Sequence, residues 1–290
     1  MVLRAIVSEN DAGRKIKLFV RGVMGVSYGQ FSSLKMRGGL RVNGEIVHAN
    51  HVLQAGEVVE VVLDEQSATD IAPDYGPVNV VYEDDDILII DKPAPLACQA
   101  SARNPEPALE NRLAGKYGAG FVFRPLNRLD KGTSGLLCAA KHAHACQKLQ
   151  KTLHTDEYLR EYLAVVCGEM TGAGTVDMPI AKVDAASVKR VVDFEKGQSA
   201  VTHWRSEGVY GEYSLIRLRL ETGRTHQIRV HMAAMGHPIA GDFLYGTELE
   251  ELPRRFALHS ARIRLVQPVT GEVIDIESTL PDELKKLIEK

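Results

Sequence analysis

The sequence predicts a two-domain α+β protein, with a small mixed domain at 1–64, a linker at 65–77 and a larger domain at 78–290. The chain has 290 residues, which is more than a single domain usually contains. Residues 65–77 are polar and include two prolines, a composition typical of linkers. After them, short apolar segments alternate with turns and a few helices. This pattern favours a mostly antiparallel mixed sheet with flanking helices and a central cleft.

The small domain is predicted to combine short strands with a helical region. Residues 38–64 contain apolar segments bounded by turns, and Asn43-Gly44 indicates a tight hairpin because both residue types tolerate positive backbone angles. Val58–Leu63 is the strand that follows a second turn. Residues 14–36 are interpreted as a helical region, although Gly22, Gly25 and Gly29 interrupt the pattern and weaken this prediction.

The larger domain is predicted to begin with two strands joined by an acidic turn, at 78–93. The acidic residues at 83–86 are interpreted as a solvated hairpin tip rather than a magnesium site. Residues 142–153 fit a short helix with apolar side chains on one face, and the aromatic and β-branched residues at 159–167 favour a strand. Residues 213–221 alternate apolar and charged side chains, which predicts a strand with one buried face.

Composition and charge favour an ordinary cytoplasmic protein. Hydrophobic residues make up 44% of the chain, charged residues 25%, and the net charge is −3. No apolar run is long enough to cross a membrane, and Glu9 and Asp11 stand where a signal peptide needs apolar residues. The four cysteines form no C-x-x-C pair and are expected to be reduced. The histidines lack metalloprotease spacing and there is no nucleotide-binding loop, so neither a metal nor a cofactor is expected.

The front of the chain carries a basic segment. Residues 1–64 hold 8 basic and 6 acidic residues, whereas every charged residue at 12–44 is basic. These are Arg14, Lys15, Lys17, Arg21, Lys35, Arg37 and Arg41. A basic patch on a mildly acidic protein is typical of a surface that binds a polyanion.

The segment NRLDKGTSGLLCAAK at 127–141 places one carboxylate, Asp130, between Arg128 and Lys131, directly before a turn and an apolar strand. An acid in this position is either a surface ion pair or a carboxylate kept ionised for chemistry, because a neighbouring guanidinium favours the charged form. A glycosidase would need a second, protonated carboxylate, and no motif supplies one. The run GTSG at 132–135 lacks one residue of the G-x-S-x-G turn of serine hydrolases, so that alternative is weak.

Two further stretches carry candidate functional residues. The segment ETGRTHQIRVHMAAMGHPIAGD at 221–242 is interpreted as the end of a strand, a turn and a helix with Thr225 as its N-cap. Its turn and first helical residues are expected to present Arg224, His226 and Arg229 in one region. In the strand at 159–167, Tyr162 is either a core tyrosine with its hydroxyl bonded at an edge or a functional group.

Together these segments resemble a known enzyme family. RLDKGTSGLL at 128–137, followed by ETGRTHQIRVHMAAMGHPIAGD at 221–242, is similar to the signature pair of the RluA-type pseudouridine synthases. REYLAVVCG at 160–168 lies between them as in that family, and ILIIDKPAPL at 87–96 resembles the family's opening strand and Lys-Pro turn. Residues 12–64 resemble the S-four-type RNA-binding domain that many members carry in front.

The resemblance implies an isomerase that converts uridine to pseudouridine within ribosomal or transfer RNA, without a cofactor or metal. Asp130 would be the catalytic carboxylate, paired with Arg229, and Tyr162 would stack on the uracil of a flipped-out uridine. Arg128 would fill the gap left in the RNA. The residues implied to bind substrate are Arg128, Arg224, His226 and Lys92, and those implied to bind RNA in the front domain are Arg14, Lys15, Lys35, Arg37 and Arg41. The expected protein is a monomer whose partner is RNA, with neither DNA nor a membrane involved.

Two alternatives stay open at the level of the sequence. Once the base has left its stack, at a cost of about a few kcal/mol, Asp130 would either attack the anomeric carbon or remove a proton from the neighbouring ribose carbon. A different class of protein, a non-catalytic RNA-binding or ribosome-assembly factor with the same fold, is the second hypothesis. The presence of Asp130, Tyr162 and Arg229 together favours the enzyme.

Overall fold

The computed structural model describes residues 2–26, 28–62, 71–101, 106–118, 120–184 and 186–289. The chain forms two compact units, Met1–Ser67 and Ala68–Lys290. The first part of the predicted linker, 65–70, lies outside the described residues. Its second part packs on the larger unit, where the Asn111 side chain donates to the Ala72 carbonyl at 2.8 Å and Arg112 Nε donates to Asp74 at 3.1 Å.

The first unit is a small α+β fold. Its elements are β1 (Val2–Ile6), α1 (Ile16–Gly22), α2 (Tyr28–Arg37), β2 (Leu40–Val42), β3 (Glu45–Ile46) and β4 (Val58–Val62), with a short 3-10 helix at Glu9–Asp11. The strands form an antiparallel sheet in the order β1-β4-β2-β3. Asn43 and Gly44 join β2 to β3 with φ angles of 51° and 84°, which confirms the predicted hairpin. Phe19 and Phe31 from the two helices belong to the core of this unit.

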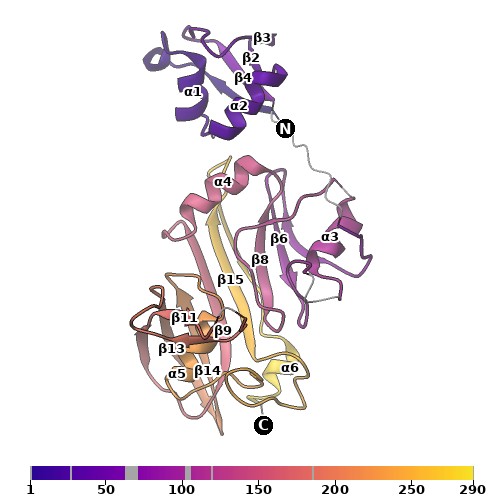
Figure 1. The fold of residues 1–290 in the computed structure, drawn as a ribbon, viewed down its shortest axis with the longest axis vertical. Helices are drawn as coiled ribbons and strands as arrows, with labels where there is room; N and C mark the ends of the chain where they lie inside the picture. Colours follow the sequence, from indigo (N-terminus) through magenta and orange to yellow (C-terminus); the bar gives the residue numbers. More distant parts are fainter. Residues whose placement is uncertain are drawn as a thin grey trace. The chain divides into compact units, whose positions relative to one another are not determined.

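The second unit contains the remaining elements (Figure 1). Its strands are β5 (Asn79–Glu83), β6 (Ile87–Lys92), β7 (Arg124–Pro125), β8 (Ser134–Ala140), β9 (Tyr158–Cys167), β10 (Ala173–Asp177), β11 (Ile180–Lys182), β12 (Arg190–Val192), β13 (Val201–Tyr210), β14 (Tyr213–Leu220), β15 (Leu258–Val266) and β16 (Val273–Glu277). Its helices are α3 (Leu109–Tyr117), α4 (Ala143–Thr152), α5 (Gln227–Ala234) and α6 (Asp282–Lys285).

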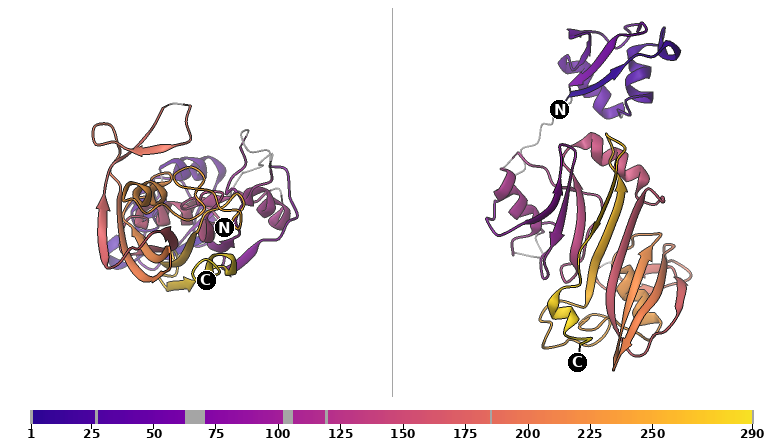
Figure 2. Two further views of the ribbon diagram at one scale, coloured as in Figure 1. Left: turned by 90° about the horizontal axis from the view of Figure 1, so that it is seen from below. Right: turned by 180° about the vertical axis from the view of Figure 1, so that it is seen from behind.

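A large mixed sheet organises the second unit. Its strands follow the order β10-β13-β14-β9-β15-β8-β6-β5, with β16 paired to β15 and β7 to β8. The neighbouring pairs are antiparallel apart from β15 and β8, which run parallel. Figures 1 and 2 show β9 and β15 running side by side through its middle, while the β11–β12 ribbon stands apart from it. These observations confirm the predicted α+β class. In the described part of the chain, no helix has the length and apolar character needed to span a membrane.

Strand β8 lies at the centre of the core and leads directly away from Asp130. All seven of its residues are buried, and successive side chains such as Leu136 and Leu137 join hydrophobic clusters on opposite faces of the sheet. Gly135 has a φ of 104°, and a Cβ at this position would lie 2.3 Å from the Ser260 carbonyl oxygen. Only glycine allows this close approach of β8 to β15, so the contact fixes the chain just after Asp130.

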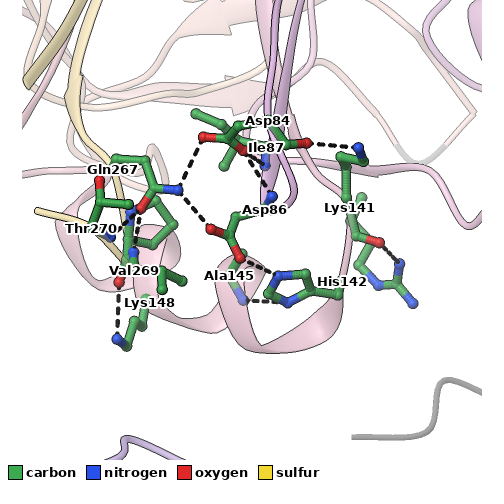
Figure 3. A network of polar contacts seen from close by, with 12 residues as sticks. Asp84, Asp86, Ile87, Lys141, His142, Ala145, Lys148, Gln267, Val269 and Thr270 are labelled. Carbon is green, nitrogen blue, oxygen red and sulfur yellow. Dashed lines mark hydrogen bonds and ion pairs between the residues drawn. The ribbon is translucent and has the colours of Figure 1, made fainter. Parts of the chain in front are cut away.

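The acidic turn between β5 and β6 is solvated only in part: Glu83 and Asp85 are exposed, but the prediction is wrong for Asp86. Asp86 is only 7% exposed, and its carboxylate contacts His142 Nε2 and Gln267 Nε2, each at 2.7 Å (Figure 3). Asp84 accepts hydrogen bonds from the Asp86 and Ile87 N–H groups and from Gln267. The start of α4 and the segment after β15 therefore cover this turn. Such a tertiary contact is not visible in the local sequence.

Candidate active site

Asp130 lies in the loop between β7 and β8, where the Thr133 N–H donates to its carbonyl oxygen. The residue lines a cavity of about 60 Å³ together with Tyr162 and Arg229. A neighbouring cavity of about 500 Å³ is also lined by Asp130 and Arg128. Asp130, Tyr162 and Arg229 therefore meet in one place, although they come from three segments that are far apart in the sequence.

Arg229 connects Asp130 to a second, buried carboxylate. Its Nη1 donates to Asp130 Oδ2 at 2.9 Å, while its Nε and Nη2 donate to the two oxygens of Asp242 at 2.7 and 2.9 Å. Asp242 is fully buried and also accepts from the N–H groups of Leu244 and Tyr245. Two-point binding of this kind fixes the plane of a guanidinium. Asp130 is thus oriented by an arginine that Asp242 holds in place.

Two aromatic rings enclose the Arg229 guanidinium. Its Cζ lies 4.1 Å from the centroid of the Phe256 ring and 5.0 Å from that of Tyr245, distances at which cation–π attraction is effective. Burial disfavours the charged form, but Asp242 and Asp130 outweigh burial, so the pKa of Arg229 is raised. A permanent positive charge therefore lies beside Asp130.

His226 is the second group near the Asp130 carboxylate. Its Nε2 lies 3.8 Å from Asp130 Oδ2, and its Nδ1 lies 2.8 Å from the Tyr245 hydroxyl. Tyr245 accepts a hydrogen bond from the Arg190 N–H, so we assign its proton to the bond with Nδ1 and the imidazole proton to Nε2, which faces Asp130. Burial lowers the pKa of His226 while Asp130 opposes this effect, which favours the neutral imidazole at neutral pH.

Helix α5 begins later than the sequence indicated. Its first residue is Gln227 and its N-cap is His226, which adopts left-handed backbone angles (φ 59°, ψ 19°), so the prediction of Thr225 as the N-cap is wrong. The Gln227 side chain accepts hydrogen bonds from the Arg224 N–H and the Thr222 hydroxyl, both at 2.9 Å. Gln227 thus closes the turn in place of a threonine cap, and the resulting geometry places His226 beside Asp130.

Tyr162 combines the two alternatives that its sequence position allowed. The residue is 5% exposed and belongs to the main hydrophobic core, yet it also lines the cavity that contains Asp130. Burial raises the pKa of its phenol, and Arg160 opposes this effect. The hydroxyl therefore keeps its proton at neutral pH, and the ring is held rigidly next to the carboxylate.

The remaining predicted substrate contacts occupy different environments. Arg128 and Arg224 are exposed at the two cavities, and Arg224 Nε donates to the Ser199 carbonyl at 2.9 Å. Lys92 is fully buried and donates to the carbonyl oxygens of Pro93 and Leu96. Burial lowers the pKa of Lys92 to about 8. Lys92 therefore holds the turn that follows β6 and does not line either cavity, so a substrate contact by this residue is not supported.

The basic residues predicted to bind RNA lie in the first unit. Arg14, Lys15, Lys35 and Arg41 are exposed there. Arg14 forms an ion pair with Asp11, which partly neutralises its positive charge. The side chain of Arg37 lies outside the described residues, so its environment is not known.

Ser134, from the sequence run that resembled a hydrolase turn, is a structural residue. It is 4% exposed, its Oγ lies 2.9 Å from His259 Nδ1, and Arg255 Nη2 donates to the same Oγ at 3.0 Å. The His259 ring continues to Ser278 and, through that hydroxyl, to Asp91. This buried chain of hydrogen bonds joins β8, β15 and the segment after β16, and Ser134 does not line the cavities that contain Asp130.

Three residues of the site were missed by the sequence analysis. Asp242, Tyr245 and Phe256 hold Arg229 and His226, but they lie in loops without regular structure. Asp242 stood at the end of the quoted segment at 221–242, so a search for a partner to the buried Arg229 could have found it. No local signal pointed to Tyr245 or Phe256, because their contacts depend on the tertiary fold.

Comparison with known proteins defines the class to which this fold and site belong. Residues 86–234 match the family model described as RNA pseudouridylate synthase. The ribosomal large subunit pseudouridine synthase D of Pasteurella multocida is 39% identical over 267 residues, which cover 86% of this chain and 82% of that protein. The protein of the same name from Haemophilus influenzae is 40% identical over 253 residues, covering 80% of this chain and 76% of that protein.

The chain therefore belongs to the RNA pseudouridylate synthase family, and it is an isomerase. The predicted resemblance to the RluA-type synthases is confirmed. Among solved structures, human RNA pseudouridylate synthase domain containing 1 is similar with a TM-score of 0.57 and 24% sequence identity, over 73% of this chain and 94% of that chain. That likeness shows a shared fold.

Proposed function

We propose that this enzyme isomerises uridine to pseudouridine in large-subunit ribosomal RNA, with Asp130 as the catalytic carboxylate. The observation that carries the proposal is the 2.9 Å ion pair between Asp130 and Arg229 at a cavity that Tyr162 also lines. The two relatives described above are named for the large ribosomal subunit, which favours ribosomal over transfer RNA. Family membership likewise favours an enzyme over a non-catalytic assembly factor.

In the proposed reaction the target uridine leaves its stack and enters the site. The Tyr162 ring stacks on the uracil and recovers part of the cost of flipping, roughly 1–3 kcal/mol per stacked base. Arg128, exposed at both cavities, fills the space that the nucleotide leaves. Asp130 faces the ribose and acts by attack on the anomeric carbon or by removal of a ribose proton. The bond from the anomeric carbon to N1 breaks, a bond to carbon 5 forms, and the proton on carbon 5 is released.

The rigid support of Asp130 suits either route. The carboxylate must be ionised and held in one orientation when the ribose arrives, and preorganised charges of this kind lower the barrier because they need no rearrangement. Arg229 supplies the permanent charge, while the neutral Nε2–H of His226, 3.8 Å away, is placed to donate when the site closes around the substrate. His226 and Arg224 are proposed to contact the nucleotide directly.

The first unit is proposed to bind the RNA away from the reaction, in the manner of an S-four-type domain. Its exposed basic residues, among them Lys15 and Lys35, support this role. RNA affinity is expected to fall steeply with salt concentration, because binding displaces counterions from the phosphates. A Lys15→Glu/Lys35→Glu variant of the full chain should bind RNA more weakly without loss of fold, and an unchanged affinity would exclude these residues from the RNA surface.

Release of tritium from RNA labelled at carbon 5 of uridine tests the proposal. Large-subunit ribosomal RNA and transfer RNA, both transcribed without modifications, are incubated separately with the wild-type enzyme. Release from ribosomal RNA alone is the expected result. Release from transfer RNA alone would refute the proposed substrate, and the absence of release from both would refute the proposed reaction on free RNA.

A further inference from the structure

Arg160 is a buried arginine that has no anionic partner among the described residues. It lies on β9, two residues before Tyr162, and is 4% exposed. Within the described part of the chain its guanidinium has no hydrogen bond or ion pair, and its Nε is buried without an acceptor. The group lies over the Tyr158 ring, 5.8 Å from the centroid. The adjacent acid, Glu161, belongs to the alternate side of the strand and pairs with Arg217.

An unpartnered guanidinium in this position is costly. Arginine does not lose its proton at physiological pH, and a largely buried charge without a counterion is strongly disfavoured. The other buried arginines of the described chain are both paired, Arg229 with Asp130 and Asp242 and Arg255 with Glu283. No carboxylate of the described chain therefore neutralises Arg160, and an anion from outside the protein would balance its charge.

A cavity of about 350 Å³ beside Arg160 has room for that anion. Two carboxylates also line it, but Asp156 and Glu221 have side chains 97% and 53% exposed and are bonded to Arg219 and His203 respectively. They are therefore solvated and paired, and they do not neutralise Arg160. A phosphate group suits this position because two of its oxygens can accept parallel hydrogen bonds from a planar guanidinium.

The cavity adjoins the site that contains Asp130. Leu220 lines both this cavity and the small one with Asp130 and Tyr162. A Cβ placed on Gly223 would lie 3.8 Å from Arg160 Nη1, and Gly223 itself lines the larger cavity beside Asp130. The guanidinium is thus reached from the same face of the protein as the catalytic carboxylate.

We propose that Arg160 binds a backbone phosphate of the RNA next to the target uridine. This inference rests on the RNA substrate proposed above and adds a contact that would hold the strand while the nucleotide flips. It also gives a function to the unpaired Arg160 guanidinium, which lies on the same strand as Tyr162. The bound phosphate would complete the charge balance of the cavity only when RNA is present.

The experiment compares the full-length wild type with Arg160→Met, Arg160→Lys and the control Arg262→Met. Arg262 is a partly exposed arginine on β15 that pairs with Asp275, so its variant removes one positive charge away from the cavity. KM and kcat are measured by tritium release on the ribosomal RNA transcript over a range of salt concentrations. Melting temperatures are measured in chloride buffer and in phosphate buffer of equal ionic strength.

Arg160→Met is expected to raise KM about tenfold with little change in kcat, and to reduce the slope of log KM against log salt by about 1. Arg160→Lys should recover part of the loss, and Arg262→Met should leave KM unchanged. In chloride, Arg160→Met should melt no lower than the wild type, because it removes an unpaired buried charge. Phosphate should stabilise the wild type more than this variant.

Three results would overturn the inference. An unchanged KM and salt slope would exclude a phosphate contact. A lower melting temperature in chloride, with no phosphate-dependent difference between the proteins, would show that Arg160 is structural. A loss in kcat at constant KM would show that it acts through Tyr162. If the wild type released no tritium from any RNA, the proposed function would fail, and the phosphate-dependent melting would still decide whether Arg160 forms an anion site.

Discussion

The two carboxylates that bind Arg229 are expected to respond differently to loss of charge. Asp242 is fully buried and accepts two hydrogen bonds from Arg229 and others from backbone N–H groups. The Asp130 side chain is 27% exposed and accepts one hydrogen bond from Arg229. Asp242→Asn should therefore destabilise the second unit, whereas Asp130→Asn should leave its stability nearly unchanged.

The magnitude follows from the burial of each pair. Removing one partner of a buried ion pair costs about 3–5 kcal/mol, and asparagine should fall near the lower value because it keeps the volume and one acceptor oxygen. At about 2–4 °C per kcal/mol for a unit of this size, the melting temperature should fall by roughly 6–12 °C. In Asp130→Asn, Arg229 keeps both hydrogen bonds to Asp242, so the change should stay within about 1 kcal/mol.

Urea unfolding followed by tryptophan fluorescence is the suitable assay. The chain has a single tryptophan, Trp204 on β13, so its emission reports on the second unit alone. Purified wild type, Asp242→Asn and Asp130→Asn are compared directly. The reasoning would be refuted if Asp242→Asn unfolded at the same urea concentration as the wild type, or if Asp130→Asn were the less stable of the two variants.

Three further outcomes follow from the same structure. Tyr245→Phe removes the hydroxyl that is hydrogen-bonded to His226 Nδ1. The value of kcat/KM for tritium release should therefore fall about tenfold, and the free energy of unfolding should fall by about 1 kcal/mol. Full activity of this variant would exclude the assigned tautomer. His144 is buried and its pKa is lowered to about 4 chiefly by burial, so the unfolded state binds a proton that the folded state rejects. Urea titrations should show stability lost as the pH falls from about 6.5 to about 4, at up to ~1.4 kcal/mol per pH unit, and less loss in His144→Leu. Gly135→Ala should lower stability by more than about 3 kcal/mol because its Cβ would meet the Ser260 carbonyl oxygen at 2.3 Å; a melting temperature like that of the wild type would contradict this contact.

Much of the fold was predictable because the local signals agree with the tertiary structure. The alternation at 213–221 gave β14 its buried and exposed faces, and Asn43-Gly44 formed the expected hairpin. The burial of Asp86 in the acidic turn at 83–86 was not predictable, because it depends on His142 and Gln267, which approach from elements distant in sequence. Solvation of a polar turn is a sound local expectation that packing can reverse.

The candidate site shows the same division. Motif resemblance brought together Asp130, Tyr162 and Arg229, which the structure places around one cavity. Resemblance also included Lys92, which proved to be buried against backbone carbonyls, because a sequence motif does not separate residues that touch a ligand from those that shape a loop. Arg160 begins the segment at 160–168 that contributed to the resemblance, but no role could be predicted for it, because its lack of a hydrogen-bond partner among the described residues depends on the tertiary fold.

The most direct test of the central claim is a comparison of Asp130→Asn with the wild type in RNA binding and tritium release on large-subunit ribosomal RNA. The variant is expected to bind RNA within about threefold of the wild type, or more tightly because it carries one fewer negative charge. It should release no tritium even in a single turnover with excess enzyme. Tritium release by Asp130→Asn at a rate near that of the wild type would contradict the assignment of Asp130 as the catalytic carboxylate.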